Sequence, residues 1–498
     1  MPRFDKMITA TGKRLHPVSM LYFLAHSGKE LAGLLPLIPV CILLADRIFG
    51  REIDRFLLTA SVILAAAILL VILAWLRWRR FVYHVEHGVL YVEHGLWVRR
   101  KVWIAKERIL SLDTTISVYD RVFGLVRLEV ETVGGDGKPE AVLSSITAEE
   151  AVRIQTALGW TRNAAASAPA AARADRAERP GGDIPHRMQL PLGRALVLSM
   201  TSGKFALIWL VIAGGGLKLW DQWLRDSAVW TYWYNQLMPA NIFGMIAVYA
   251  AVTWLLAFAV TFFLEHGFRL EIDGDKLAIE RGLWEKKRKV IATRRIQAVR
   301  VTENALHKLF GMASVRIVVA GSSDEEKKTI DLFPVVRNSE LPALFETFLT
   351  DFHLPKTWNP ASPRAYRSYV LFPALLSLGA AAAAILWLPT DWRWCALLFP
   401  VIVWLGGVLK FRQTAWSQED GQLAIRYGSF SRQRVLVPRF RIQWHRTSQT
   451  PIQEGRRLAT LKVAVASGKS GSAFSLRHFS ASDIRELSNW LSRSEKHV

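Results

Sequence analysis

Hydrophobic residues are segregated along this chain into long uncharged runs, and the stretches between the runs alternate in polarity. Three runs of about 20 residues, Leu57–Leu76, Ile242–Leu264 and Tyr369–Leu388, contain no charged residue. A helix rises about 1.5 Å per residue, so each run is long enough to cross the roughly 30 Å of hydrocarbon in a bilayer. The pattern therefore predicts an integral membrane protein.

Shorter apolar segments accompany these runs and predict one helical hairpin in each third of the chain. Leu31–Ala45 precedes the first run, Phe205–Leu217 precedes the second, and Trp394–Leu409 follows the third. We therefore expect six transmembrane spans in three hairpins, of which Leu31–Ala45 and Phe205–Leu217 are the least secure because they are short. Near the start of the chain, His16–Leu24 is too short to span and suits a helix in the headgroup region.

After each hairpin comes a polar stretch of about 80 residues in which apolar positions alternate. Alternation around a glycine-containing turn predicts β-hairpins at Val85–Val92, Leu270–Ile279 and Trp416–Ile425, with turns at His87-Gly88, Asp273-Gly274 and Asp420-Gly421. Each stretch closes with an amphipathic helical pattern, at Thr147–Leu158, Asn338–Leu349 and Ser480–Leu491. Strands followed by one helix predict a small antiparallel sheet that curls and is covered by its C-terminal helix.

The segment Val290–Val319 occurs three times. Matching segments begin near Val102 and Leu436, at constant offsets of 187 and 146 residues. A repeat of this length indicates that the chain builds one structural unit three times.

The net charge of +22 suggests two kinds of partner, nucleic acid and an anionic membrane surface. The basic residues gather at the ends of the apolar segments, which favours the membrane and disfavours nucleic acid. They are more numerous on the side of the termini and the polar stretches than in the short loops between paired spans. By the positive-inside rule, we expect both termini and all three polar stretches to be cytoplasmic.

The candidate binding residues form a basic run near the start of the repeated segment. The run comprises Arg99, Arg100 and Lys101 in the first repeat and Lys286, Lys287, Arg288 and Lys289 in the second. The third repeat has only Arg432 and Arg434. Cations near an anionic leaflet each contribute about 1 kcal/mol to binding, so these residues are candidates for holding lipid headgroups or partner proteins. The alternative is a solvated strand face without a ligand.

Other residues offer weaker candidates. Arg108, Arg295 and Arg441 occupy the same place in the three repeats, and each is expected to pair with an acidic side chain or a strand end rather than to form a shared functional site. His84 and His87 fall on opposite faces of a strand and do not predict a metal site. The sequence contains no nucleophile–base pair, cofactor fingerprint or metal-ligand cluster, so we expect neither an enzyme nor a cofactor.

At this point the repeats resemble a known family. The residues that show the resemblance in the second repeat are Gly282-Leu283-Trp284, Ile291, Arg295-Ile296 and Leu309-Phe310-Gly311. In the first repeat they are Gly95-Leu96-Trp97, Ile104, Arg108-Ile109 and Phe123-Gly124. They resemble the bacterial pleckstrin-homology (PH) domains of YdbS/YdbT-type membrane proteins. The resemblance implies a curved seven-stranded sheet with a C-terminal helix, a bacterial inner (plasma) membrane location, and no established biochemical activity.

The third repeat departs from this pattern. Gly428-Ser429-Phe430 replaces Gly-Leu-Trp, and Arg456-Arg457 stands where Phe-Gly is expected. If the aromatic–glycine pair forms a tight turn under the sheet, we expect that turn to be built differently in the third repeat.

The resulting domain division alternates membrane and PH-like parts. It comprises 1–80 (interfacial segment and first hairpin), 81–160 (first PH-like domain), 161–187 (flexible Ala/Pro linker), 188–265 (second hairpin), 266–352 (second PH-like domain), 353–412 (third hairpin) and 413–498 (divergent third PH-like domain).

The preferred function is a non-enzymatic scaffold that binds anionic lipid or partner proteins, with a role in envelope stress or resistance to membrane-active peptides. The partners expected are membrane lipids and either further copies of the chain or a small PH-like membrane protein. The alternative is a transporter or lipid-translocating protein that uses the six helices as its pathway. Spans free of charged residues argue against ion coupling.

Overall fold

A computed structural model describes residues 12–32, 55–96, 98–132, 139–160, 187–200, 242–320, 329–387, 396–467 and 472–492. The chain divides into two compact units, Met1–Ile184 with Glu285–Val290, and Pro185–Trp284 with Ile291–Val498. The expected span Phe205–Leu217, nearly all of Leu31–Ala45 and nearly all of the linker 161–187 lie outside the described residues.

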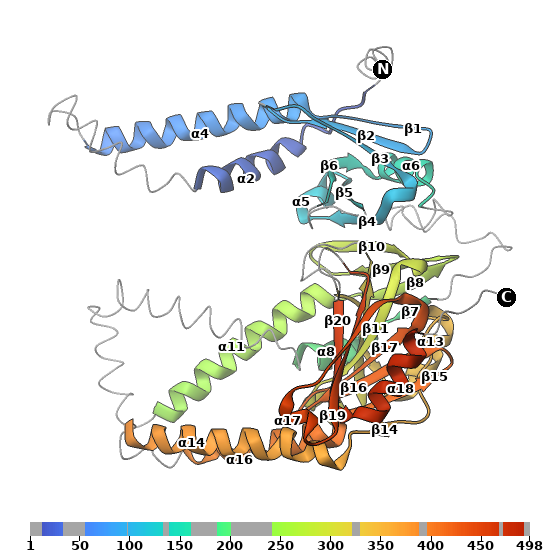
Figure 1. Ribbon diagram of the computed structural model, residues 1–498. Coiled ribbons are helices and arrows are strands. Elements are labelled where there is room, and N and C mark those ends of the chain that lie inside the picture. The colour runs from blue at the N-terminus through green and yellow to red at the C-terminus, as the bar shows by residue number, and fades with distance from the viewer. Residues whose placement is uncertain are drawn as a thin grey trace. The chain divides into compact units, whose positions relative to one another are not determined.

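The first unit begins with two helices, α2 (Ser19–Ala32) and α4 (Arg55–Arg80) (Figure 1). The helix α4 is continuous over 26 residues and includes the whole run Leu57–Leu76. Its last turn carries Arg77, Arg79 and Arg80. The indole Nε1 of Trp78 donates to the carbonyl oxygen of Leu15 at 3.1 Å, which joins the helix end to the segment before α2.

The first repeat forms two small antiparallel sheets. The first contains β1 (Val82–Glu86), β2 (Val89–His94) and β3 (Arg100–Ala105). The second contains β4 (Ile109–Ile116), β5 (Leu125–Thr132) and β6 (Ala141–Thr147), with the short helix α5 (Val118–Val122) between β4 and β5. The helix α6 (Ala148–Ala157) follows, and its Thr147 cap accepts a hydrogen bond from the Glu150 amide as the capping-box spacing predicts. Alternate apolar side chains from both sheets and α6 form one core.

A segment of the second repeat also belongs to the first unit. Residues 285–290 fall within it, and β10 (Lys286–Ala292) lies next to β4 in the sheet order β6-β5-β4-β10.

In the second unit, the rest of the second repeat comprises β7 (Arg187–Gln189), α8 (Leu192–Met200), α11 (Ile242–Glu265), β8 (Arg269–Asp273), β9 (Lys276–Arg281), β11 (Ile296–Glu303), α12 (Ala305–Leu309), β12 (Met312–Val319), β13 (Thr329–Arg337) and α13 (Leu341–Phe348). The third repeat comprises β14 (Asn359–Pro360), α14 (Phe372–Trp387), α16 (Leu398–Gln413), β15 (Ala415–Glu419), β16 (Gln422–Gly428), β17 (Arg432–Pro438), β18 (Ile442–Ser448), α17 (Pro451–Glu454), β19 (Leu458–Val465), β20 (Ser472–Ser480) and α18 (Ala481–Ser492). The helices α14 and α16 run side by side (Figure 1).

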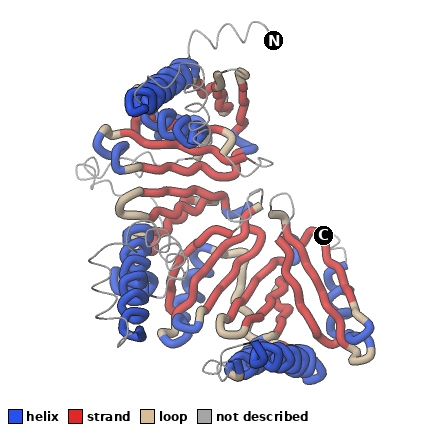
Figure 2. The backbone as a smooth tube through the Cα atoms, turned by 90° about the vertical axis from the view of Figure 1, so that its left-hand side faces the viewer, coloured by secondary structure: helices blue, strands red, loops and turns tan. Residues whose placement is uncertain are grey.

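The strands of the second and third repeats share one sheet of seven strands, in the order β13-β12-β11-β17-β16-β15-β14. The resemblance implied a seven-stranded sheet within each domain. Instead, the strands of the third repeat divide between this shared sheet and a separate one, β18-β19-β20 (Figure 2). The hydrophobic core also extends across both repeats, because Ala298 and Val318 of the second repeat pack in the same cluster as Leu423 and Leu487 of the third.

Two helices in the described part of the chain are long and apolar enough to cross a membrane, Ala247–Glu265 and Pro363–Leu386. Most of their side chains are exposed in the protein alone. The expected count of six spans is therefore not confirmed. The three β-rich domains, by contrast, are present as predicted.

The divergent turn of the third repeat keeps the backbone of the other two. Gly124 and Gly311 have φ angles of 65° and 60°, and Arg457 at the same place has 56°. The expectation of a differently built turn is wrong, because an arginine here adopts the left-handed conformation that glycine adopts without cost.

Candidate functional site

The Gly-Leu-Trp turn of the second repeat is bonded to the end of the apolar helix α11. The Gly282 amide donates to the His266 carbonyl at 2.9 Å, and the Leu283 amide donates to the Phe263 carbonyl at 3.0 Å. The Trp284 and Phe263 rings meet edge to face, with centroids 6.0 Å apart. The strand β10 therefore starts at the exit of this helix.

The other two repeats connect the turn to the helix end through a side chain instead of backbone amides. In the first, Arg80 at the end of α4 donates through Nη1 to the Leu96 carbonyl. In the third, Gln413 at the end of α16 donates through Nε2 to the Ser429 carbonyl at 2.7 Å. The loss of Leu-Trp in the third repeat has therefore not removed the contact between turn and helix.

The sheets begin almost where the helices end. One residue separates Arg80 of α4 from Val82 of β1, and one separates Gln413 of α16 from Ala415 of β15. Since a residue extends at most about 3.6 Å, each of these sheets starts within one or two residue lengths of its helix.

The short helices α5 and α12 carry apolar side chains to the surface at equivalent positions. Val122 is 77% exposed and Leu309 is 79% exposed, and the neighbouring Phe123 and Phe310 are also exposed. We call these four side chains the apolar tips. The tip of α12 lies near the exit of α16, because Lys308 Nζ donates to Gln413 Oε1 at 3.3 Å and to the Phe430 carbonyl at 3.2 Å.

The sequence pattern did not identify the apolar tips. The aromatic–glycine pair predicted a turn tucked under the sheet, and the turn is present but its aromatic ring points outward. The available signal was the apolar residue that immediately precedes the aromatic in both repeats, Val122 and Leu309. A turn requires the glycine, but it does not require two consecutive apolar side chains before it.

The seven candidate basic residues do not form one cluster. Arg99, Arg100, Lys286 and Lys287 are exposed. Arg99 lies 3.8 Å from Glu93, and Lys287 lies 3.3 Å from Glu285. Lys101 and Arg288 are partly buried and take part in contacts within the protein.

Lys289 is also partly buried, and its ammonium group contacts Asp113 of the strand β4. Its Nζ lies 3.0 Å from Asp113 Oδ2 and 3.6 Å from Glu131 Oε2. Burial raises the pKa of Asp113 to about 6; Glu131 acts in the same direction and Lys289 opposes it. Burial alone would lower the pKa of Lys289, but the two carboxylates raise it above its ordinary value.

A second buried ion pair, at different positions of the repeat, joins the second and third repeats. Glu303, whose side chain is 3% exposed, pairs with Arg434 and lies 3.5 Å from Arg432 Nη1. It sits at the end of the antiparallel pairing of β11 with β17, opposite Arg432. In both places an acidic residue pairs with a basic residue of the next repeat. The acidic residue lies on β4 or β11, and the basic residue lies on β10 or β17.

The three matching arginines end short 3₁₀ turns, Lys106–Arg108, Thr293–Arg295 and Arg439–Arg441. Arg441 donates through Nη1 to the Arg294 carbonyl at 2.7 Å, and its Nη2 lies 3.8 Å from Asp351. Its acidic partner thus belongs to the preceding repeat, and the arginine adds to the contact between repeats.

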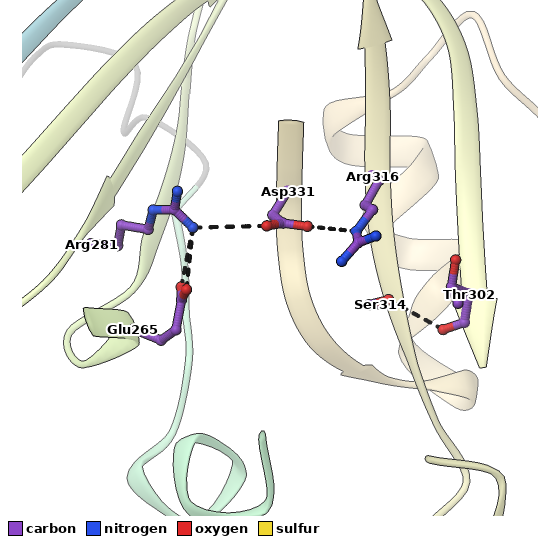
Figure 3. Close-up of polar contacts among 6 residues, drawn as sticks. All are labelled: Glu265, Arg281, Thr302, Ser314, Arg316 and Asp331. Atoms are coloured by element: carbon purple, nitrogen blue, oxygen red, sulfur yellow. Dashed lines mark hydrogen bonds and ion pairs between the residues drawn. The ribbon is translucent and has the colours of Figure 1, made fainter. Parts of the chain in front are cut away.

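A polar network ties α11 to the sheet of its own repeat (Figure 3). Arg281 Nη1 lies 3.3 Å from both carboxylate oxygens of Glu265, at the helix end, and 3.8 Å from Asp331 Oδ2 on β13. Arg316 on β12 donates from Nε to the other oxygen of Asp331 at 2.7 Å. The network is structural in character. Within the described ranges, no three His, Cys, Asp or Glu side chains are grouped to hold a metal ion.

Comparisons with known proteins agree with this repeated architecture. The family model described as "Bacterial PH domain" matches residues 34–159, 215–345 and 372–495. The UPF0699 transmembrane protein YdbT of Bacillus subtilis (strain 168) is 28% identical over 500 residues, which cover 96% of this chain and 98% of that protein. No solved structure matches the chain.

Proposed function

The chain belongs to the bacterial PH domain family, and from this premise we propose that it is a non-enzymatic scaffold of the bacterial inner membrane. Its three PH-like domains lie against the cytoplasmic leaflet and hold anionic lipid headgroups. A role in envelope stress or in resistance to membrane-active peptides is an extension of this proposal.

The observation that carries the proposal is the attachment of each repeat to the exit of an apolar helix. The glycine turn is bonded to the helix end in all three repeats, so the strand that follows starts within a few residues of that end. In the proposed placement, this is the level at which the chain leaves the hydrocarbon. The last turn of α4 adds Arg77, Arg79 and Arg80 to its own helix exit, and the last turn of α16 adds Lys410 and Arg412 to its own. Each such cation contributes about 1 kcal/mol near an anionic leaflet.

The apolar tips support the same placement. Exposed Val, Leu and Phe side chains in water are unfavourable, and exposed apolar groups beside basic residues are typical of surfaces that enter the headgroup region. At roughly 25 cal/mol per Å² of apolar area, two such side chains transferred from water stabilise the docked state by about 3 kcal/mol.

The depth of the α12 tip tests the proposal. The full chain, with Cys41 and Cys395 replaced by serine, is labelled with a nitroxide at Leu309→Cys and reconstituted in nanodiscs containing phosphatidylglycerol. We expect the label to be reached by oxygen and shielded from a water-soluble nickel complex. A matched label at Glu346→Cys, on the exposed face of α13, is expected to show the opposite accessibility.

The charge contribution is tested in the same discs. Lys286→Glu with Lys287→Glu is expected to reduce the shielding of the Leu309 label when the lipid is anionic, and to change it little in phosphatidylcholine alone. Equal accessibility of the Leu309 and Glu346 labels in every lipid would show that the domain does not lie on the bilayer.

A further inference from the structure

The pairing of β11 with β17 defines how one PH-like domain attaches to the next. The strands are antiparallel, with Val299 opposite Leu436, Val301 opposite Arg434 and Glu303 opposite Arg432. Neighbouring side chains on both strands are fully buried, and the ion pair of Glu303 closes one end of the junction. The second and third PH-like domains are thus attached to each other by antiparallel strand pairing.

The strand β3 is the first-repeat counterpart of β17. The constant repeat offsets place Arg99, Lys101 and Val102 where the third repeat has Arg432, Arg434 and Val435. Both basic positions that hold Glu303 are therefore kept. Yet β3 is the last strand of its three-stranded sheet, and none of the described strands pairs with its outer edge.

One side chain on this edge differs in exposure from its counterpart. Trp103 of β3 is 58% exposed, whereas Leu436, at the same place in β17 and opposite Val299 of β11, is 0% exposed. An outer edge normally carries polar or charged side chains, which prevent it from pairing with other chains. A large aromatic side chain on an unpaired edge instead marks a surface that a partner covers.

We propose that β3 is the docking edge for a PH-like domain of another polypeptide. The first strand of that domain's second sheet, the strand equivalent to β11, pairs antiparallel with β3. It covers Trp103 and places an acidic side chain between Arg99 and Lys101, as Glu303 is placed between Arg432 and Arg434. This inference rests on the proposed scaffold function and names the kind of partner that the scaffold takes.

The occupant is not a second copy of this chain, because its own open strand does not fit. The strand β18 is the counterpart of β11 and lies at the edge of its sheet. It is followed by Gln449 where β11 ends in Glu303, and it carries Thr447 in place of the buried Val301. In the β11·β17 register, β18 would place Gln449 opposite Arg99, so that it would bring no carboxylate to the basic end of β3.

A peptide probe tests the docking edge. The peptide has the sequence of residues 295–305 of this chain, with a benzoylphenylalanine photocrosslinker at Arg300, and is added to the full chain in nanodiscs. We expect crosslinks within residues 100–105, since the register places Arg300 opposite Val435, the counterpart of Val102. A control peptide with Glu303→Lys is expected to crosslink at least tenfold less.

Charge reversal of the protein makes the test specific. The variant Arg99→Glu with Lys101→Glu is expected to lose crosslinking to the original peptide and to gain it with the Glu303→Lys peptide. Restored crosslinking shows that the variant is folded. The proposal would be overturned if crosslinks were found only in residues 432–438, or if the crosslinking yield were the same with and without the two charge reversals.

A disulfide test addresses the second copy. In the chain without Cys41 and Cys395, Trp103→Cys is combined with His445→Cys, the pair that matches Leu436 and Val299 in the known register. We expect no covalent dimer after oxidation in membranes. A dimer would assign the edge to a second copy and refute a separate partner. Neither test depends on the depth of Leu309, so failure of this inference is distinguishable from failure of the scaffold function.

Discussion

At the residue scale, two sets of glycines serve different needs. A Cβ added at Gly428 would lie 1.9 Å from the Ser431 carbonyl oxygen, and one added at Gly95 would lie 2.0 Å from that of Val98. Nothing lies within 4 Å of a Cβ added at Gly311 or Gly124, where only the positive φ favours glycine. This difference explains why the third repeat keeps Gly428 but tolerates Arg457.

The two glycine sets predict unequal costs of substitution. Gly311→Ala is expected to cost about 1 kcal/mol, because an L-residue pays only for the left-handed conformation. Gly428→Ala is expected to cost about 3 kcal/mol or more, because the backbone must move away from the Ser431 carbonyl. Thermal unfolding of the purified full chain should show the larger loss for Gly428→Ala, and equal losses would contradict the steric argument.

The raised pKa of Asp113 predicts a pH dependence in the first unit. A carboxyl whose pKa is about 6 in the folded protein and near 3.8 when unfolded binds its proton more tightly in the folded state. Its contribution to stability is therefore present at low pH and is lost as the pH rises through 6, by about 1 kcal/mol between pH 5 and pH 7. Asp113→Asn should flatten this dependence, measured as the thermal midpoint against pH, whereas Glu149→Gln, at an exposed position of α6, should not.

At the scale of elements, the strand is the unit by which repeats are joined. The sheet from β13 to β14 contains strands of both the second and the third repeat, and their common core includes Ala298 and Leu423. A helix–helix or loop contact would let the domains move independently. A continuous backbone ladder does not, and the buried Glu303 fixes its register.

Removal of the Glu303 charge is expected to weaken this ladder. Glu303→Gln leaves Arg434 without its carboxylate and is expected to cost about 2 kcal/mol, less than for a fully buried pair because both arginines are partly exposed. Hydrogen exchange should quicken in β11 and β17 and remain unchanged in β1 and β2. The matched control is Glu346→Gln on α13, and a similar effect of that exposed substitution would mean that the junction does not depend on the ion pair.

The sequence predicted where many strands and turns lie, but it did not predict which strands of different repeats pair with each other. Alternation and the turns at His87-Gly88 and Asp420-Gly421 predict the opening hairpins, and both turns have the expected positive φ angles. Strand pairing between repeats is made by backbone hydrogen bonds, which leave no pattern in the sequence. The residues that reveal it, Glu303 and Arg434, are 131 positions apart, and only the fold brings them together.

At the scale of the whole molecule, the expected orientation follows from the basic helix ends. We expect Lys287→Cys, in the chain without Cys41 and Cys395, to react with a membrane-impermeant maleimide in inverted vesicles and not in intact cells. Labelling of intact cells would reverse the proposed topology. The sequence predicted this orientation from charge alone. It did not predict the apolar tips, since the apolar residues of a short helix look the same whether they face a core or a lipid surface.

The single residue between α16 and β15 has a mechanical consequence. The Thr414 amide still donates to the Lys410 carbonyl at 3.0 Å, so the last helical hydrogen bond ends at the residue that directly precedes β15. A change in the direction of α16 is therefore passed directly to β15. Because β15 belongs to the sheet that also contains β11, β12 and β13, the strands of the second repeat turn together with a helix of the third.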